Sequence, residues 1–239
     1  MKLAVISDIH SNLYGLEAVL KDIGEKGVTD IFCTGDLVGY GPRPNEVIDL
    51  IRKLNIPTVM GNYDDAIGNL RLMCGCDYKD ERSLQLAEKS LLWTKDNTSE
   101  TNKQWLRELS EEIRIIFSGM EILFVHGSPR ALNEYLYEDT PENYIKDLLD
   151  EVGADILVCG HTHLSYIKKT SAGYIVNAGS AGKPKHGNPN VTYLVLEVAG
   201  GELIGQIVEV PYNYEDAAKE IEQVGLPREF AEIIRTGRT

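Results

Sequence analysis

The feature that most constrains the fold is an alternation of short apolar segments with helix-like segments in the first quarter of the chain. Residues 3–6, 30–34 and 56–60 are short, mostly apolar runs of the kind that buried strands contain. Residues 12–25 and 45–54 place Leu, Ile and Val at helical spacing, with Ser11 or Asn12 available to cap the first helix. Strand–helix–strand repeats favour a parallel sheet with right-handed crossovers. We therefore predict an α/β fold.

The rest of the chain returns to strands after a long polar interruption. Residues 63–112 carry helix-like segments at 81–93 and 99–109, which predict a helical insertion and not an independent domain. Strands are expected at 113–117, 121–125, 155–159, 165–169, 174–176, 191–198 and 202–210, with a helix at 141–152 and a helical tail at 213–239. This count predicts one domain, residues 1–239, built as a four-layer α/β/β/α sandwich of two mixed sheets.

The charge and hydropathy of the chain limit its partners. The sequence has 37 acidic and 24 basic residues, a net charge of -13. That field repels a nucleic-acid backbone, so we expect no bulk nucleic-acid binding, whereas a small anionic substrate remains compatible because bound cations reverse the field locally. The sequence has no signal-peptide pattern and no apolar run of the roughly 18 to 20 residues that span a bilayer. A cytoplasmic protein that does not bind membranes is expected.

The four cysteines fit the same expectation. Cys33 and Cys159 lie in predicted strands, where a small buried thiol is the ordinary interpretation. Cys74 and Cys76 are separated by a single residue, which is not the C-x-x-C spacing of a zinc site. We expect all four to be reduced thiols.

Five predicted strands end in residue types that bind metals. In open α/β sheets the carboxyl ends of the strands are where ligands bind, so these residues are expected to meet at one edge. Each motif alone has an ordinary structural interpretation, such as a helix cap or a buried histidine. It is the agreement of all five strand ends that indicates a site. The motifs are Asp8-Ile9-His10, Gly35-Asp36, Gly61-Asn62, His126-Gly127 and Gly160-His161-Thr162-His163.

The residue types at these ends indicate two metal ions. Imidazole nitrogen with carboxylate and amide oxygen suits Mn, Fe, Zn or Co better than a thiolate-preferring ion. Two carboxylates, one amide and four imidazoles are too many for one ion and enough for two, provided that one carboxylate bridges. Two ions roughly 3.5 to 4 Å apart form the clamp of phosphatases and nucleases. The sequence therefore predicts a hydrolase of phosphate esters or phosphoanhydrides.

In this order the motifs resemble the calcineurin-like metallophosphoesterase family, and Asn177-Ala178-Gly179-Ser180 resembles a loop of its bacterial phosphodiesterase-like branch. The resemblance implies that Asp36 bridges two divalent metals and that a bridging hydroxide is the nucleophile. Mn²⁺ is the first expectation for these metals, with Fe, Zn, Ni, Co and Mg as alternatives. The resemblance implies Asp8, His10 and His163 as ligands of one metal and Asn62, His126 and His161 as ligands of the other.

The sequence departs from the family pattern beside Asn62. The family pattern is usually Gly-Asn-His-Asp or Gly-Asn-His-Glu, in which His protonates the leaving group, whereas this chain has Gly61-Asn62-Tyr63-Asp64. Phosphodiesterase-like members also vary here. A phenol of pKa about 10 is a weak acid near neutral pH. We therefore expect a preference for leaving groups that need little protonation, such as aryl esters, nucleotides or anhydrides. The catalytic candidates are Asp36, Asn62, Tyr63 and Asp64.

Three basic side chains are candidates for substrate contacts. Arg43 follows the second predicted strand, Arg130 follows the His126 motif, and Lys183 lies in a loop after Asn177 together with Lys185 and His186. Each can meet a phosphate that projects from the metals. For both arginines a solvent-exposed surface charge is the alternative interpretation.

Several functions fit this site. A phosphodiesterase or broad phosphoesterase acting on small phosphorylated molecules is the leading prediction, and a dinucleoside polyphosphate hydrolase or a protein phosphatase are alternatives. A non-catalytic interaction module is the alternative of another class, and the full ligand set argues against it. A dinucleotide loop at Gly39-Tyr40-Gly41 is rejected because Pro44 stands where the third glycine belongs. The C-terminal helices can pack on their own domain or on a second subunit, so a homo-oligomer stays open.

Overall fold

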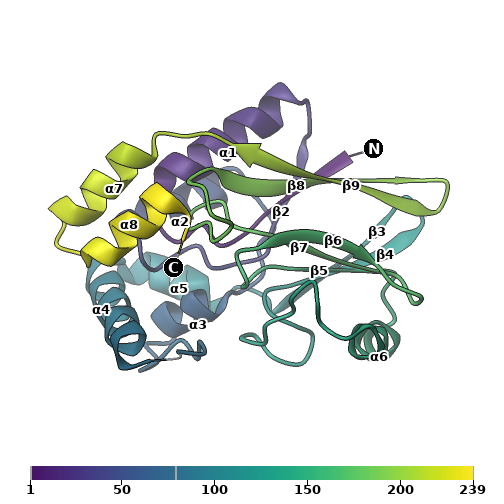
Figure 1. The fold of residues 1–239 in the computed structure, drawn as a ribbon, viewed down its shortest axis with the longest axis horizontal. Helices are drawn as coiled ribbons and strands as arrows, with labels where there is room; N and C mark the ends of the chain where they lie inside the picture. The colour runs from purple at the N-terminus through teal and green to yellow at the C-terminus, as the bar shows by residue number, and fades with distance from the viewer. Residues whose placement is uncertain (1, 79, 239) are drawn as a thin grey trace.

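The computed structural model describes residues 2–78 and 80–238 and stacks two mixed β-sheets face to face (Figure 1). The first sheet has the order β2-β1-β8-β9, and the second has the order β3-β4-β5-β7-β6. The first sheet consists of β1 (Lys2–Ile6), β2 (Asp30–Cys33), β8 (Val191–Ala199) and β9 (Glu202–Val210). The second consists of β3 (Glu112–Phe117), β4 (Met120–Val125), β5 (Ile156–Cys159), β6 (Ser165–Lys169) and β7 (Tyr174–Ala178). Parallel and antiparallel pairs occur in both, as predicted.

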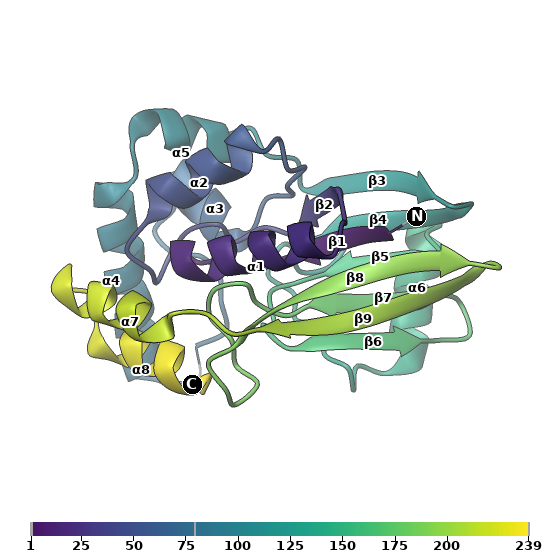
Figure 2. The same cartoon turned by 90° about the horizontal axis from the view of Figure 1, so that it is seen from above.

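Helices cover the outer face of each sheet. The first sheet is covered by α1 (Leu13–Glu25) and α2 (Pro44–Lys53), and the second by α6 (Glu142–Val152), as Figures 1 and 2 show. Asn12 caps α1 by accepting a hydrogen bond from the Gly15 amide at 3.0 Å. The four layers therefore follow the predicted order of helix, sheet, sheet and helix.

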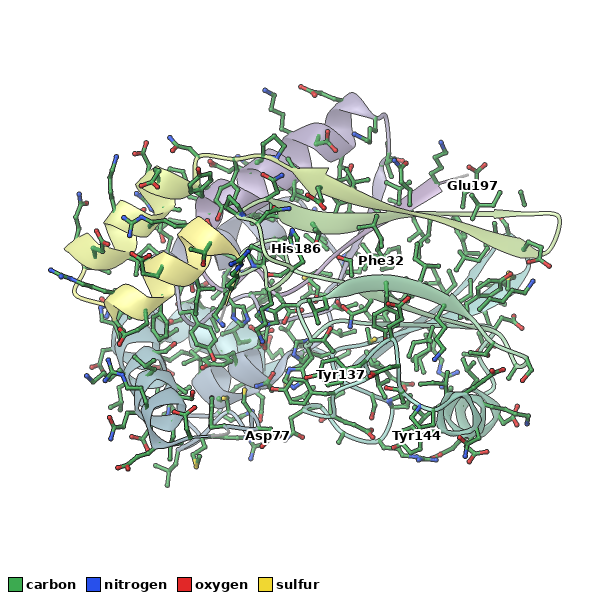
Figure 3. The ribbon with its side chains drawn as sticks, in the orientation of Figure 1. Phe32, Asp77, Tyr137, Tyr144, His186 and Glu197 are labelled. Carbon is green, nitrogen blue, oxygen red and sulfur yellow. The ribbon has the colours of Figure 1, made fainter. Side chains whose placement is uncertain are left out.

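Alternating side chains of β1 divide the core into two layers. Leu3 and Val5 point between the sheets, while Ala4 and Ile6 pack under the helices of the first sheet. Between the sheets the ring of Phe32 stacks on that of Phe124, with centroids 4.6 Å apart (Figure 3). Full burial of each large apolar side chain contributes about 1.5 to 3 kcal/mol. The period-two pattern of the strand thus fixes which residues join the two sheets.

The remaining helices gather at one end of the sandwich (Figures 1 and 2). They are α3 (Asn62–Gly68), α4 (Glu81–Asn97), α5 (Glu100–Arg107), α7 (Tyr214–Gln223) and α8 (Arg228–Thr236). Leu86 and Trp93 of α4 pack against the apolar faces of α7 and α8, so the insertion and the tail cover one another. Among the described helices, none combines the length and the apolar character needed to cross a bilayer.

One predicted strand is wrong. Residues 56–60 make only two isolated bridges, between Cys33 and Thr58 and between Val59 and Ser110. Pro57 has no N–H to donate, so the segment bonds to β2 only through the Pro57 carbonyl and the Val59 amide. The segment still runs parallel to β2 and delivers residue 62 to the same edge. The short helix α3, which begins there, was not predicted.

Candidate metal centre

The seven candidate metal ligands converge at one edge of the two sheets. They lie in the loops after β1, β2, β4 and β5 and at the first residue of α3. Two groups have ligand atoms within 4.8 Å of one another, and all six residues of these groups are buried. The groups are Asp8, His10 and His163, and Asp36, His126 and His161. Each group takes residues from both sheets.

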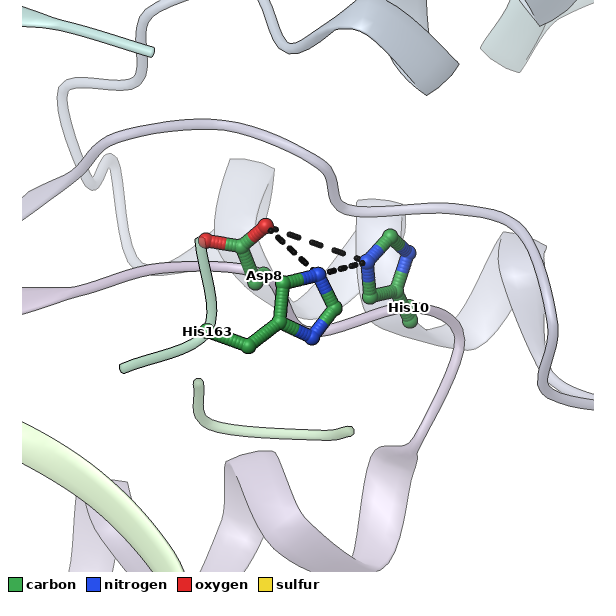
Figure 4. Close-up of side chains that lie close together, drawn as sticks. All are labelled: Asp8, His10 and His163. Carbon is green, nitrogen blue, oxygen red and sulfur yellow. Dashed lines mark hydrogen bonds and ion pairs between the residues drawn. The ribbon is translucent and has the colours of Figure 1, made fainter. Parts of the chain in front are cut away.

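The first group brings unshared electron pairs face to face (Figure 4). The Nε2 atoms of His10 and His163 are 3.2 Å apart, and His163 Nε2 is 3.3 Å from Asp8 Oδ1. The Nδ1 atom of His10 donates to the Val38 carbonyl at 3.0 Å, and that of His163 donates to the Lys183 carbonyl at 2.6 Å. Because a carbonyl only accepts, each Nδ1 carries the proton and each Nε2 presents a lone pair. Two lone pairs this close repel one another unless a proton or a metal cation lies between them.

The second group has the same arrangement. His126 donates from Nδ1 to the Thr34 carbonyl at 2.7 Å, and its Nε2 lies 3.0 Å from Asn62 Oδ1. Asn62 donates from Nδ2 to the Cys74 carbonyl at 3.0 Å, which turns its oxygen towards His126. His161 Nε2 is buried and has no hydrogen-bond partner among the described residues. The Asn62 oxygen thus lies beside this group, and its role as a metal ligand stays a prediction.

Asp36 lies between the two groups. Its Oδ2 atom is 3.6 Å from His10 Nε2 and 3.5 Å from His126 Nε2, while Oδ1 accepts the Tyr63 amide at 2.8 Å. One carboxylate oxygen therefore faces both groups and is placed to bridge two ions. The two oxygens of Asp8 also have different surroundings. Oδ2 accepts a hydrogen bond from the His161 amide at 2.9 Å, and Oδ1 is buried without a hydrogen-bond partner among the described residues. The donor set and these orphaned atoms fit two divalent metals.

The backbone at the ligands is wound into the left-handed region. The φ angles are 50° at Asp8, 49° at His10, 55° at Asp36, 66° at His161 and 61° at His163. Such angles cost a side-chain-bearing residue of order 1–3 kcal/mol and are typical of functional sites. Backbone hydrogen bonds between the loops hold them, including that from the Asp8 amide to the Gly35 carbonyl at 3.0 Å.

Burial sets the charges of the ligands. It lowers the pKa of His10 and of His161 to about 3, so both rings are neutral at neutral pH and can donate lone pairs. Burial also raises the pKa of Asp8 to about 6. At His126 burial acts to lower the pKa, but the Asp36 carboxylate outweighs it and the pKa rises to about 9. The proton favoured at His126 occupies the place that a metal cation would take.

Asp64 supports the candidate metal ligands through hydrogen bonds to the backbone. Asp64 accepts the amides of Asp36 and Gly61 on Oδ2, at 2.8 and 2.9 Å, and the Leu37 amide on Oδ1 at 2.9 Å. Its carboxylate therefore joins the Asp36 loop to the start of α3. A Cβ on Gly61 would lie 2.2 Å from the Asp36 amide nitrogen, so this close approach requires glycine.

Tyr63 forms a wall of the site. Its side chain is 1% exposed, and its ring contacts the edge of the His10 ring, with centroids 5.5 Å apart and planes at 85°. Gly39 and Tyr40 pack on its other side. Burial raises the pKa of the phenol well above its ordinary value, so it holds its proton firmly.

The basic candidates lie in different surroundings. Arg43 is held by Glu220 of α7 at 2.7 Å, beside a cavity that His10 and Lys183 also line. Lys183 is 7% exposed, and its ammonium lies 4.2 Å from the centroid of the Tyr40 ring. The structure therefore brings Lys183 to the centre.

Arg130 lies towards α6. It pairs with Glu151 at 2.7 Å and sits over the Tyr144 ring, 5.0 Å from its centroid. Tyr144 belongs to α6, on the outer face of the second sheet (Figure 3). The arginine is thus engaged by surface partners, and its role as a substrate contact stays a prediction.

Three residues around the centre were not among the candidates predicted from the sequence. The Tyr135 ring lies 4.0 Å from the His161 ring, and Tyr137 stacks beyond it at 5.8 Å. Ser180 donates to the Asp8 carbonyl at 2.7 Å and accepts the Lys183 amide at 2.6 Å, so it ties the Lys183 loop to the first ligand. The motif around Asn177 signals the serine, but nothing local signals the tyrosines.

Comparisons with known proteins agree with this centre. A model of the calcineurin-like phosphoesterase superfamily domain matches residues 1–201. The uncharacterized protein MJ0912 of Methanocaldococcus jannaschii is 32% identical over 253 aligned residues, covering 99% of this chain and 98% of that one. The phosphodiesterase YfcE of Escherichia coli is 24% identical over 199 residues, covering 79% of this chain and 84% of that one.

A solved structure extends the likeness to the whole fold. The crystal structure of a metallophosphoesterase from Sphaerobacter thermophilus is 30% identical, with a TM-score of 0.77 and 99% of both chains covered. The match spans the first sheet, the insertion, the second sheet and the C-terminal helices. This chain belongs to the calcineurin-like phosphoesterase superfamily.

Proposed function

We propose that this protein hydrolyses phosphodiesters of small molecules with the help of two divalent metal ions, with Mn²⁺ the preferred ion. The observation that carries the proposal is the position of Asp36 Oδ2, 3.6 Å from His10 Nε2 and 3.5 Å from His126 Nε2. A single carboxylate oxygen shared by two sets of inward-facing lone pairs suits a pair of ions better than one. When bound, such a pair lowers the pKa of water and polarises phosphoryl oxygens.

The chain's own residues hold and orient this centre. Asp8, His10 and His163 would hold one ion, and Asn62, His126 and His161 would hold the other, with Asp36 between the two groups. The carbonyls of Val38, Thr34 and Lys183 fix the tautomers of three of the imidazoles. Because the ligands are buried and the loops are cross-bonded, the geometry is set before substrate arrives.

The test of the proposal is metal-dependent hydrolysis of bis-p-nitrophenyl phosphate and p-nitrophenyl phosphate. We expect activity with Mn²⁺, loss of activity with a chelator, and a higher rate on the diester. A higher rate on the monoester would make the protein a phosphomonoesterase. A purified protein that holds no metal and cleaves neither substrate would instead support the non-catalytic interaction module.

Tyr63 is expected to set the choice of leaving group. Burial raises the pKa of the Tyr63 phenol and makes it a weak general acid, so leaving groups that need little protonation, such as aryl esters and anhydrides, are favoured. Changing Tyr63→His is expected to raise the rate on glycerol 2-phosphate relative to p-nitrophenyl phosphate by about 100-fold, the low end for a positioned general acid. Tyr63→Phe is the matched control and should leave the ratio near the wild-type value. An unchanged ratio in Tyr63→His would show that residue 63 does not face the leaving group.

A second candidate function, hydrolysis of dinucleoside polyphosphates, is favoured by the buried Lys183 and the half-buried Lys185. Lys183 and Lys185 lie close enough to Asp8 and Asp36 for the carboxylates to act on the lysine pKa values. Burial, with a contribution from Lys185, lowers the pKa of Lys183 to about 7. The two lysine side chains beside a pair of metal ions would add positive charge to the site, and a substrate with adjacent phosphates would neutralise it.

Replacing the lysines is expected to separate the two substrate classes. Lys183→Met and Lys185→Met should each lower kcat/KM for diadenosine triphosphate by about 10-fold or more, since a charge-assisted hydrogen bond contributes about 1.5–3 kcal/mol. The rate on bis-p-nitrophenyl phosphate should change less. The exposed Lys21→Met, whose side chain is 77% exposed, is the matched control. Equal losses on both substrates would assign the lysines to the shared phosphate and count against the polyphosphate.

We also propose a cellular compartment and a class of partner. We place the protein in the cytoplasm, with a small phosphorylated molecule as its partner. A protein phosphatase remains the third enzymatic candidate and predicts release of phosphate from phosphopeptides. Its test uses the same assay format with a phosphoserine peptide as substrate.

A further inference from the structure

Two thiols lie almost in contact in the loop that follows α3. The Sγ atoms of Cys74 and Cys76 are 3.0 Å apart. Cys74 is 8% exposed and Cys76 is partly exposed, so an oxidant can reach the pair. The other two cysteines, Cys33 and Cys159, are completely buried at the ends of β2 and β5. None of the functions considered above uses the Cys74–Cys76 pair.

The loop holds both thiols on one side. Gly75, between them, has a φ of +77°, which glycine adopts without strain, and its carbonyl accepts a hydrogen bond from Asn133 Nδ2 at 2.5 Å. The Tyr78 hydroxyl lies 2.8 Å from Cys74 Sγ. A disulfide has an S–S distance of about 2.05 Å, so the sulfurs need to approach by about 1 Å. Rotation of the backbone at Gly75 would allow the two sulfur atoms to approach one another.

The loop is coupled to the metal centre through Asn62. The Asn62 side chain donates from Nδ2 to the Cys74 carbonyl at 3.0 Å and to Cys76 Sγ at 3.1 Å. Both contacts turn Asn62 Oδ1 towards His126, 3.0 Å away. The described contacts of the first group, Asp8, His10 and His163, do not include this loop. Movement of the loop therefore acts on the second group.

We propose that Cys74 and Cys76 are a reversible oxidation site, which hydrogen peroxide converts to an intramolecular disulfide that weakens the metal group containing Asn62. One thiol sulfur attacks a peroxide oxygen, the O–O bond breaks, and a sulfenic acid and one water form. The second sulfur then attacks the sulfenic sulfur, the S–O bond breaks, and a second water leaves. Two thiols lose two protons and two electrons, and one peroxide becomes two waters. The small ring makes the disulfide strained, so dithiols reduce it readily.

Peptide mass spectrometry tests the disulfide directly. The protein is reduced, desalted, treated with hydrogen peroxide, alkylated with iodoacetamide and digested with trypsin. Cleavage after Arg71 and Lys79 gives one peptide, residues 72–79, that contains both thiols, while Cys33 and Cys159 fall in other peptides. We expect this peptide to lose about 2 Da and to resist alkylation, and dithiothreitol to restore both. Alkylation at both residues after peroxide, or a sulfinic acid without a disulfide, would overturn the proposal.

Metal content tests the coupling, which rests on the proposed metal centre, whereas the disulfide does not. After peroxide removal and gel filtration, oxidised protein is expected to retain about half the Mn²⁺ of reduced protein. Cys74→Ser, treated with the same peroxide, should retain its full content, and Cys76→Ser, which keeps an acceptor for Asn62 Nδ2, provides the same test from the other side. Equal metal in oxidised and reduced wild type would overturn the coupling. A reduced protein without metal would refute the metal centre itself, while the peptide result would stand.

Discussion

Replacing Asp36 by Asn is expected to lower Mn²⁺-dependent hydrolysis of bis-p-nitrophenyl phosphate by about 1000-fold, the upper end for one electrostatic contact in an active site. The substitution keeps the shape of the side chain and removes the charge from the oxygen that faces both groups. A neutral amide oxygen is a poor bridge between two cations, so at least one ion should be lost. Metal content per chain is expected to fall from two to one or fewer.

The control for this change is Asp49→Asn on α2, where the side chain is 64% exposed and pairs only with Arg52. It removes the same charge and should alter neither metal content nor rate. Far-ultraviolet circular dichroism would establish that both variants are folded. Two bound metals and a normal rate in Asp36→Asn would exclude Asp36 as the bridge.

Chelation of the metals is expected to lower the melting temperature by about 5–10 °C. An ion at 100 times its dissociation constant stabilises the folded state by about 2.7 kcal/mol, and about 2–4 °C follows from each kcal/mol in a chain of this size. The physical reason is the arrangement of acceptors at His10, His163 and Asp8, which repel one another when no cation lies between them. Differential scanning calorimetry with excess chelator and then with excess Mn²⁺ measures the shift.

The matched comparison is the same titration on Asp36→Asn. Its shift should be smaller, because the bridging charge is missing. A wild-type melting temperature that is the same with chelator and with Mn²⁺ would show that the facing imidazoles are satisfied by protons alone. Such a result would show that metal binding does not stabilise the fold, and the Asp36→Asn rates would then be the remaining test of the metal centre.

The local pattern of the sequence predicted most elements but not how the strands pair. The period-two alternation in β1 and the helical spacing in α1 are local signals, and both elements are where they were expected. The third strand failed because one missing N–H at Pro57 outweighs an apolar run. The helix α3 gave no clear signal because it has only seven residues, which is too short to show a helical repeat of apolar positions. No local pattern indicates that Leu3 pairs with Leu196.

In the metal centre, too, the sequence predicted the features that follow from local motifs but not those that depend on distant partners. The strand-end motifs correctly predicted which residues lie close together, because the carboxyl ends of neighbouring parallel strands lie at the same edge of a sheet. The surroundings of the basic residues depended on distant partners. Arg43 meets Glu220 and Arg130 meets Glu151, and neither pairing can be read from spacing. The hydrogen bonds by which Asp64 joins the Asp36 loop to the start of α3 likewise have no signature in the sequence.

The central place of β1 in its sheet has a consequence for how the protein is made. β1 pairs on one side with β2, but on the other side with β8, which ends at Ala199. Strand β1 leaves the ribosome long before β8 and therefore keeps an open edge until β8 has been synthesised. His163 likewise reaches Asp8 only after the 154 residues between them have been synthesised, so this group of candidate ligands is completed late in translation. A nascent chain that stalls early would expose an unpaired strand and an empty half-centre, which is the species that a chaperone would have to protect.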